Sequence, residues 1–175
     1  PLPESAYPSK VIKSESEELQ IEFKTGELFA INGKKGKPYE LIQRLQILAR
    51  DFGIGRDIHV GDTIIGIKGR VGFEAAAPII IIKAHHLLEK HTLSKWQLFQ
   101  KEQLSNFYGM QLHEGHYLDP VMRDLEAFMQ SSQEKVSGKV YLKLYPYRYE
   151  LEGIESPHDL TVSYTHLRAH ETETN

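Results

Sequence analysis

Apolar and polar residues alternate in two segments of this 175-residue chain, one towards each end, so that every second side chain there is apolar. Residues 19–24 alternate in this way, and a second apolar run over 28–31 follows a threonine-glycine turn. Residues 139–144 and 147–152 repeat the pattern on either side of a proline break. Because successive side chains of a strand point to opposite faces, this alternation indicates half-buried strands. The sequence therefore predicts an antiparallel hairpin at each end of the chain.

Between the hairpins, apolar residues recur every three or four positions, which is the spacing of one helix face. This spacing predicts helices over 39–52, with Gly53 at the C-terminal cap, and over 78–91. A third helix is predicted after an N-cap at Ser94, and a fourth is predicted to begin at Asp119-Pro120. The third helix carries one apolar stripe, formed by Trp96, Phe99, Leu104, Phe107 and Tyr108. In the fourth helix, the side chains predicted to face inward are Val121, Met122, Leu125, Phe128 and Met129.

The segment 53–74 is punctuated by glycines and predicts short strands joined by tight loops. Its β-branched pieces are Thr63-Ile64-Ile65 and Arg70-Val71. Strands at both ends with helices between them indicate an α+β fold rather than a doubly wound one. We therefore expect a layered domain in which antiparallel strand hairpins at both ends pack with about four helices.

Composition narrows the class of partner. The chain is 40% hydrophobic and 26% charged, which is typical of a folded globular protein. Its 21 basic and 24 acidic residues give a net charge of -3, so neither nucleic acid nor an anionic membrane is an implied partner. The longest apolar run, 75–82, is far shorter than the roughly 20 residues that span a bilayer. The absence of cysteine excludes disulfides and thiolate chemistry and is compatible with a reducing cytosol.

Few residues point to chemistry by themselves. Glycine-rich stretches at 53–56 and 66–70 could present amides and a cation to an anion, but tight turns explain these glycines better. The histidines of 113–116 fall one position short of the zincin spacing, so we interpret the histidines as surface or helix-packing residues rather than metal ligands. No serine lies in a nucleophile elbow. The tyrosines of 141–149 could stack on a planar ligand, pack across strands or form a subunit interface.

Two neighbouring motifs resemble the signature of the argininosuccinate synthases. Gly-Ile-Gly-Arg at 53–56 is similar to the family's G-[IV]-G-R segment. Ile-Gly-Ile-Lys-Gly-Arg-Val-Gly-Phe-Glu at 65–74 is similar to the G-x-K-S-R-G-x-Y-E-T-P loop that follows it. Shorter matches occur in the family's order upstream and downstream: 23–26, 32–34, 38–42, 84–93, 131–140 and 155–157. The resemblance covers residues 2–160.

The resemblance implies an ATP-dependent carbon–nitrogen ligase of arginine biosynthesis. Members of the family use ATP to convert citrulline to an adenylate, which the aspartate amine then displaces, with release of AMP and pyrophosphate. ATP is the expected co-substrate, with Mg, and both are expected to bind mainly in an N-terminal domain. We therefore expect no catalytic residue in this chain and no activity of the chain alone. The resemblance also implies a cytoplasmic homotetramer for the full-length protein.

The same resemblance divides the chain into three parts. Residues 1–18 are expected to be a linker from an N-terminal ATP-binding domain, and 19–160 a synthetase and multimerisation domain. Residues 161–175 resemble translated sequencing-adapter read-through and are expected not to be native.

Six positions correspond, by this resemblance, to the citrulline side of the family's site: Gly61, Asp62, Lys68, Arg70, Phe73 and Glu74. Lys68, Arg70 and Glu74 match the family's motif. Gly61 stands where the family commonly has a citrulline-contacting glutamate, and Phe73 where it has a citrulline-contacting tyrosine. We hypothesise that Asp62, Arg70 or Glu74 takes over part of the contact, or that the substrate is a modified citrulline.

Two other classes of function stay open. The chain could be a non-catalytic binding or oligomerisation module that uses the segment 53–74 or the tyrosine-rich hairpin. A metal-dependent hydrolase is the third and most distant alternative.

Overall fold

A computed structural model describes residues 2–161 of the chain. This part contains four α-helices and two antiparallel sheets, of five and two strands, which confirms the predicted α+β class. The elements are η1 (Glu4–Ala6), β1 (Glu17–Lys24), β2 (Glu27–Ile31), β3 (Lys34–Lys35), α1 (Pro38–Arg50), β4 (Arg56–Asp62), β5 (Lys68–Glu74), α2 (Ala76–Thr92), α3 (Lys95–His113), α4 (Pro120–Gln133), β6 (Gly138–Tyr145) and β7 (Arg148–Glu155). The segment 161–175, expected not to be native, lies outside the described residues apart from Thr161.

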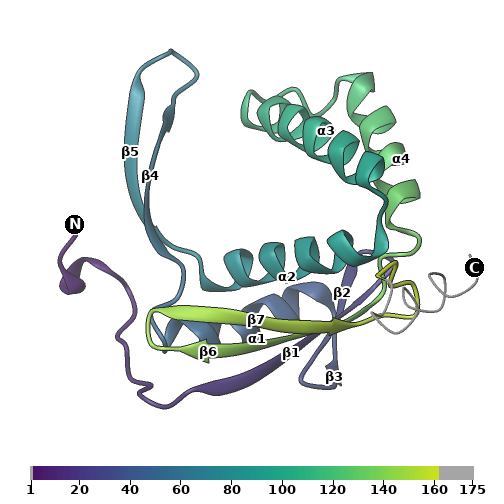
Figure 1. Ribbon diagram of the computed structural model, residues 1–175. Coiled ribbons are helices and arrows are strands. Elements are labelled where there is room, and N and C mark those ends of the chain that lie inside the picture. The colour runs from purple at the N-terminus through teal and green to yellow at the C-terminus, as the bar shows by residue number, and fades with distance from the viewer. Residues whose placement is uncertain (1, 162–175) are drawn as a thin grey trace, which may run out of the picture.

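The two end hairpins form a single sheet with the strand order β3-β2-β1-β6-β7 (Figure 1). β1 and β6 pair antiparallel at its centre, with Ile21 opposite Val140. The alternating apolar residues of both strands face the core as predicted, and none is more than 2% exposed: Leu19, Ile21, Phe23, Val140, Leu142 and Leu144. The local patterns predicted each hairpin, whereas the union of the two hairpins is a finding of the structure.

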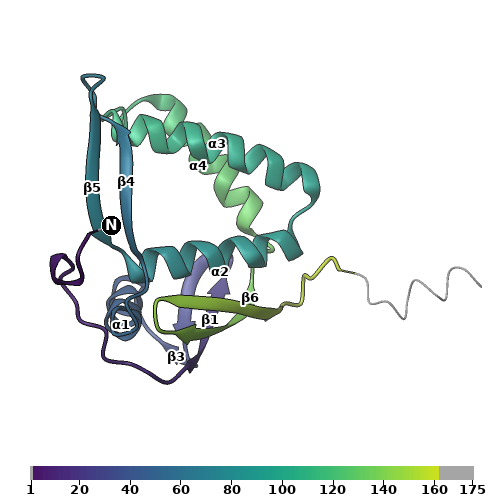
Figure 2. The ribbon, with the colours of Figure 1, turned by 60° about the vertical axis from the view of Figure 1, so that its left-hand side comes forward.

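Helices α1 and α2 pack together on this buried face of the sheet (Figures 1 and 2). Leu41 and Leu45 of α1 and Ile80 and Leu88 of α2 are fully buried in the same apolar cluster as the strands. A side chain of this kind contributes about 1.5–3 kcal/mol when it is fully buried. The predicted helices are confirmed, because their observed bounds differ from the predicted ones by at most two residues.

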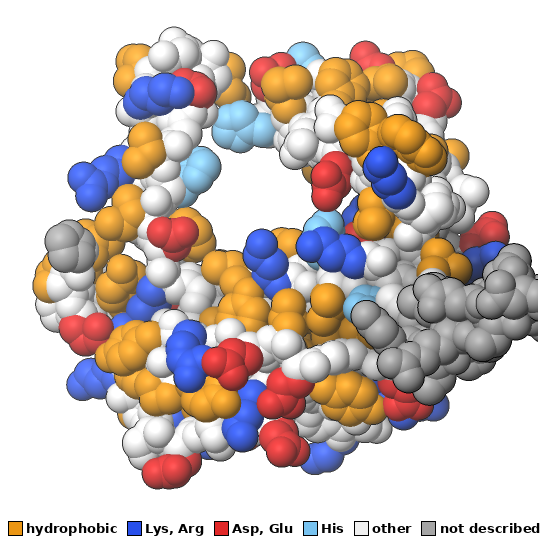
Figure 3. All heavy atoms as spheres, viewed as in Figure 1, with side chains coloured by type: hydrophobic (Ala, Val, Ile, Leu, Met, Phe, Trp, Pro, Cys, Tyr) orange, Lys and Arg blue, Asp and Glu red, His pale blue; other side chains and the backbone are white. Residues whose placement is uncertain are grey.

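Two arms extend from the ends of α2. The β4–β5 hairpin precedes α2 and the α3–α4 pair follows it, and the two arms enclose an open hollow (Figures 1 and 3). No residue of α3 is buried, so its predicted stripe is not a core face, and Trp96 and Phe99 are 69% and 52% exposed. By contrast, α4 buries Met122 and Leu125, as predicted.

One prediction for the segment 53–74 is wrong. Thr63-Ile64-Ile65 was expected to be a strand piece, but it lies in the turn between β4 and β5. Gly66 has a φ of +78°, which reverses the chain there, and Thr63 donates its backbone N–H to the Ile67 carbonyl at 2.9 Å. Turn geometry therefore overrides the strand propensity of these β-branched residues, and Ile64 and Ile65 are 75% and 79% exposed.

Gly55, which directly precedes β4, brings the base of the hairpin into contact with the start of α2. Gly55 has a φ of +83°, and a Cβ there would lie 2.5 Å from the backbone nitrogen of Ala76. Gly55 also accepts a hydrogen bond at its carbonyl from the Ala75 N–H, at 2.9 Å. Only glycine fits both this backbone conformation and this close approach.

We expect Gly55→Ala to destabilise the protein more than Gly66→Ala. Both glycines have positive φ, so each substitution costs about 1–2 kcal/mol in backbone strain. A Cβ at Gly66 meets nothing within 4 Å, whereas a Cβ at Gly55 collides with backbone and adds about 1–3 kcal/mol. Urea denaturation of both variants measures the difference. Equal losses of unfolding free energy would show that the base of the hairpin can shift away from α2.

Candidate functional site

The β4–β5 hairpin carries all six predicted site residues, and they lie on two different faces. Residues that are directly opposite in an antiparallel pair project to the same side. One face carries the pairs Arg56–Glu74, Ile58–Gly72, Val60–Arg70 and Asp62–Lys68; the other carries Asp57–Phe73, His59–Val71 and Gly61–Gly69. We call these the outer face and the inner face.

The surroundings of the two faces differ. Leu2 packs against Gly72, so the amino-terminal segment covers the base of the outer face. The inner face borders a cavity whose opposite wall includes His113 of α3, and it therefore faces the hollow between the arms. Of the predicted residues, Gly61 and Phe73 lie on the inner face, and Asp62, Lys68, Arg70 and Glu74 on the outer face. The structure does not bring the six together in one cavity.

A buried ion pair closes the base of the outer face. The Arg56 Nε donates to Glu74 Oε2 at 3.1 Å, and the two side chains are only 6% and 3% exposed. The guanidinium also contacts Glu4 at 2.5 Å and donates to the Ser9 carbonyl at 2.6 Å. Burial lowers the pKa of Arg56, and the ion pairs with Glu4 and Glu74 raise it by more. The Glu74 carboxylate is therefore committed to Arg56, a residue that was part of the recognised motif but was not predicted as a site residue.

The tip of the outer face is exposed to solvent. Lys68 and Asp62 form an ion pair at 2.6 Å, with side chains 68% and 67% exposed. Such a surface pair contributes at most about 1 kcal/mol. Arg70 lies two pairs along the ladder, at the next pair on the outer face, and has no ion-pair partner within the part of the chain that the structure describes. Arg70 is therefore a cation that is available to an anionic ligand.

The inner face forms one wall of a cavity of about 500 Å³. Its lining residues come from both strands, the turn and α3: His59, Gly61, Asp62, Thr63, Ile64, Ile65, Gly69, Val71 and His113. Gly61 and Gly69 are directly opposite, so a patch of bare backbone lies in this wall. The imidazole of His59 extends along the strand and occupies the space that a side chain at Gly61 would need.

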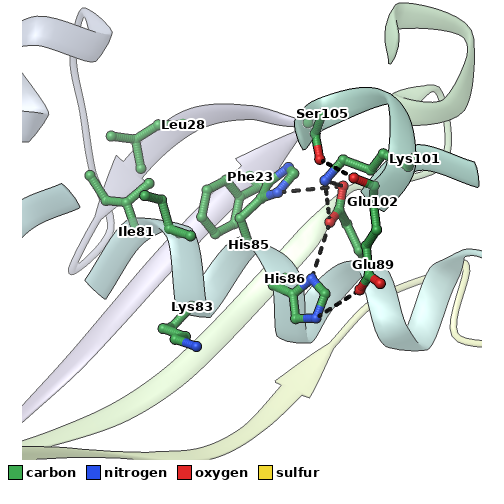
Figure 4. A pocket seen from close by; sticks show the side chains of 12 residues that line it. Phe23, Leu28, Ile81, Lys83, His85, His86, Glu89, Lys101, Glu102 and Ser105 are labelled. Carbon is green, nitrogen blue, oxygen red and sulfur yellow. Dashed lines mark hydrogen bonds and ion pairs between the residues drawn. The ribbon is translucent and has the colours of Figure 1, made fainter. Parts of the chain in front are cut away.

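A second cavity, of about 600 Å³, lies between α2, α3 and the turn that joins β1 to β2 (Figure 4). Its polar end is Glu89, which is fully buried. Lys101 of α3 contacts both carboxylate oxygens at 2.5 and 2.6 Å, and Gln133 of α4 donates to one of them at 2.8 Å. The negative charge of Glu89 is therefore compensated inside the protein, and the cluster joins α2 to α3 and α4.

Two histidines of α2 flank Glu89, with Nδ1 atoms 3.6 Å (His85) and 3.7 Å (His86) from its oxygens. His85 also packs edge-on against Phe23, with ring centroids 5.1 Å apart, so it is a helix-packing histidine. Burial lowers the pKa of His85, and the nearby Glu89 opposes this effect. Within residues 2–161, no group of three or more His, Cys, Asp or Glu side chains is arranged to hold a metal ion. No helix of that range is both long and apolar enough to cross a bilayer.

A family model and individual relatives of this chain both point to the same family. The family model described as "Arginosuccinate synthase C-terminal domain" matches residues 5–173. The argininosuccinate synthase of Xanthomonas campestris pv. campestris is 36% identical over 156 residues, which is 89% of this chain and 38% of that protein. Those of Dehalococcoides mccartyi (strain BAV1) and Methanocaldococcus jannaschii are 39% and 37% identical, over 91% and 90% of this chain and 40% and 41% of theirs. The chain thus spans about two fifths of the length of these curated relatives.

We expect Glu74→Gln to lower the free energy of unfolding by about 3–5 kcal/mol, because it leaves the buried Arg56 guanidinium partly uncompensated. Asp62→Asn, at the exposed pair on the same face, is the matched control and is expected to cost less than about 1 kcal/mol. Urea denaturation of the two variants and the parent checks both values. Similar losses in both variants would contradict the structural role of the pair at the base.

The stability of the protein should fall as the pH falls below the ordinary pKa of histidine, about 6.5. Because burial lowers the pKa of His85 in the folded state, the unfolded state binds the proton more readily in this range. His85→Gln is expected to flatten the decrease in unfolding free energy between about pH 7.5 and about pH 5.5. Its control is His116→Gln, at a side chain that is 55% exposed, and it should keep the parent's profile. A His85→Gln profile that matches the parent's would contradict this account.

Proposed function

Because the chain belongs to the argininosuccinate synthase family, through its C-terminal domain, we propose that it is part of an ATP-dependent carbon–nitrogen ligase. The proposed reaction joins citrulline to aspartate and releases AMP and pyrophosphate, in arginine biosynthesis. The observation that carries the proposal is the family match over residues 5–173. The β4–β5 hairpin, which holds the recognised motif, is the proposed substrate element.

The hairpin is proposed to position substrates rather than to perform chemistry. Positioning of bound reactants and preorganised charges both lower the barrier of such a transfer. Arg70 is the member of the motif that is free to bind a substrate carboxylate, while Asp62 and Lys68 lie beside it at the tip. Glu74 acts on the hairpin itself through Arg56. ATP, with Mg, is proposed to bind mainly in an N-terminal domain of the complete protein, which residues 1–18 would join to the domain of 19–160.

A homotetramer in the cytoplasm is proposed for the complete protein. Apolar side chains exposed on both arms are consistent with contacts to other parts of an assembly, since such groups mark interaction surfaces when they cluster. They include Ile64 and Ile65 at the hairpin tip and Trp96 and Phe99 on α3. The same exposure favours the second candidate function, a non-catalytic binding or oligomerisation module.

We expect the complete protein to release pyrophosphate from ATP only when citrulline and aspartate are both present, and the 175-residue chain alone to release none. A folded, complete protein that releases no pyrophosphate under these conditions would favour the binding-module alternative.

Arg70→Ala should raise the KM for citrulline or aspartate about ten- to hundredfold, because it removes a charge-assisted hydrogen bond. Arg44→Ala, at an exposed arginine of α1, is the matched control and should leave KM unchanged.

A further inference from the structure

The inner face of the hairpin lacks a side chain at two opposite positions, and a neighbouring imidazole fills part of the space. Gly61 leaves its position without a side chain, and Gly69 opposite leaves no side chain there either. His59 lies two residues earlier on the same face, and its Nε2 occupies the space where a Cβ at Gly61 would begin. An imidazole thus lies where a side chain at position 61 would lie.

The other polar residues of the motif cannot fill this space. Lys68, Arg70 and Glu74 belong to the outer face, and the strand separates their side chains from the cavity. Asp62 borders the cavity at the tip, but its carboxylate is paired with Lys68 at 2.6 Å. Phe73, on the inner face, has no polar atom in its side chain. The polar inner-face side chains of β4 and β5 are Asp57 and His59, and of these two His59 is the one that lies beside Gly61.

Resting on the proposed function, we infer that His59 is a specificity-determining residue, which hydrogen-bonds the ureido group of the substrate. A neutral imidazole offers one donor and one acceptor, and a ureido group offers a carbonyl acceptor and N–H donors. Within the proposed reaction, the imidazole is thus the recognition element for citrulline, which is a ureido amino acid.

Side chains at positions 59 and 61 compete for the same space on the inner face. Any Cβ at Gly61 would collide with the His59 imidazole in its present conformation. A side chain at position 61 would therefore displace the imidazole of His59 from the space that it occupies here. The effects of substitutions at the two positions should be strongly non-additive.

The test measures citrulline binding by calorimetry, and citrulline KM and kcat, in the complete protein and its variants. His59→Ala is expected to weaken binding about three- to tenfold and to raise KM with little change in kcat. His59→Gln retains a donor and an acceptor and should bind nearly as well as the parent. Gly61→Glu displaces the imidazole, so adding His59→Ala to it should cost little further binding: the double variant His59→Ala/Gly61→Glu should bind citrulline within about twofold of Gly61→Glu alone.

Val60→Ala is the matched control, since Val60 is 60% exposed on the outer face next to His59. It should leave binding unchanged. If His59→Ala also binds citrulline as the parent does, or if the double variant loses as much affinity relative to Gly61→Glu as His59→Ala loses relative to the parent, the role of His59 is overturned even where the parent is fully active. If the parent binds citrulline through His59 but releases no pyrophosphate, the proposed reaction fails and the role of His59 stands. A folded parent that binds no citrulline would overturn both.

Discussion

The antiparallel pairing of β1 with β6 is the contact on which the rest of the structure depends. A two-stranded hairpin by itself is marginally stable in water, whereas a sheet of three or more strands with a buried face can persist. Through this pairing, the two end hairpins become one five-stranded sheet, with an apolar face that α1 and α2 cover. The position of α2 on that face then determines where both arms begin, because each arm is connected to one end of this helix.

The sheet and α2 determine where the candidate site lies, because short connections join α2 to both arms. Gly55 brings the base of the hairpin against the first turn of α2, and the Arg56–Glu74 pair holds the two strands there. At the other end of the helix, Glu89 receives contacts from Lys101 of α3 and Gln133 of α4. Two buried charged clusters thus hold the two arms at the two ends of α2.

Local patterns in the sequence predicted the elements but not their long-range relations. The alternation over 19–24 and the helical spacing over 39–52 depend on burial of one face, and both predictions are confirmed because burial is what the structure provides. Thr63-Ile64-Ile65 was mispredicted because the turn at Gly66, rather than side-chain preference, decides its conformation. The assignment of site residues to two faces depends on the β4–β5 register, which became visible only in the structure, and so the position of His59 above Gly61 was missed.

The separation in sequence between β1 and β6 also affects how the chain folds during synthesis. Closing a contact between such distant segments is slow, because chain entropy must be lost before the pairing stabilises anything. Until Val140 and its neighbours have left the ribosome, the β1 edge that will receive them presents unpaired N–H and C=O groups, and α1 and α2 lack the part of the apolar face that β6 supplies. Nascent chains that end before this strand would therefore be prone to aggregation and dependent on chaperones, however complete their helices are.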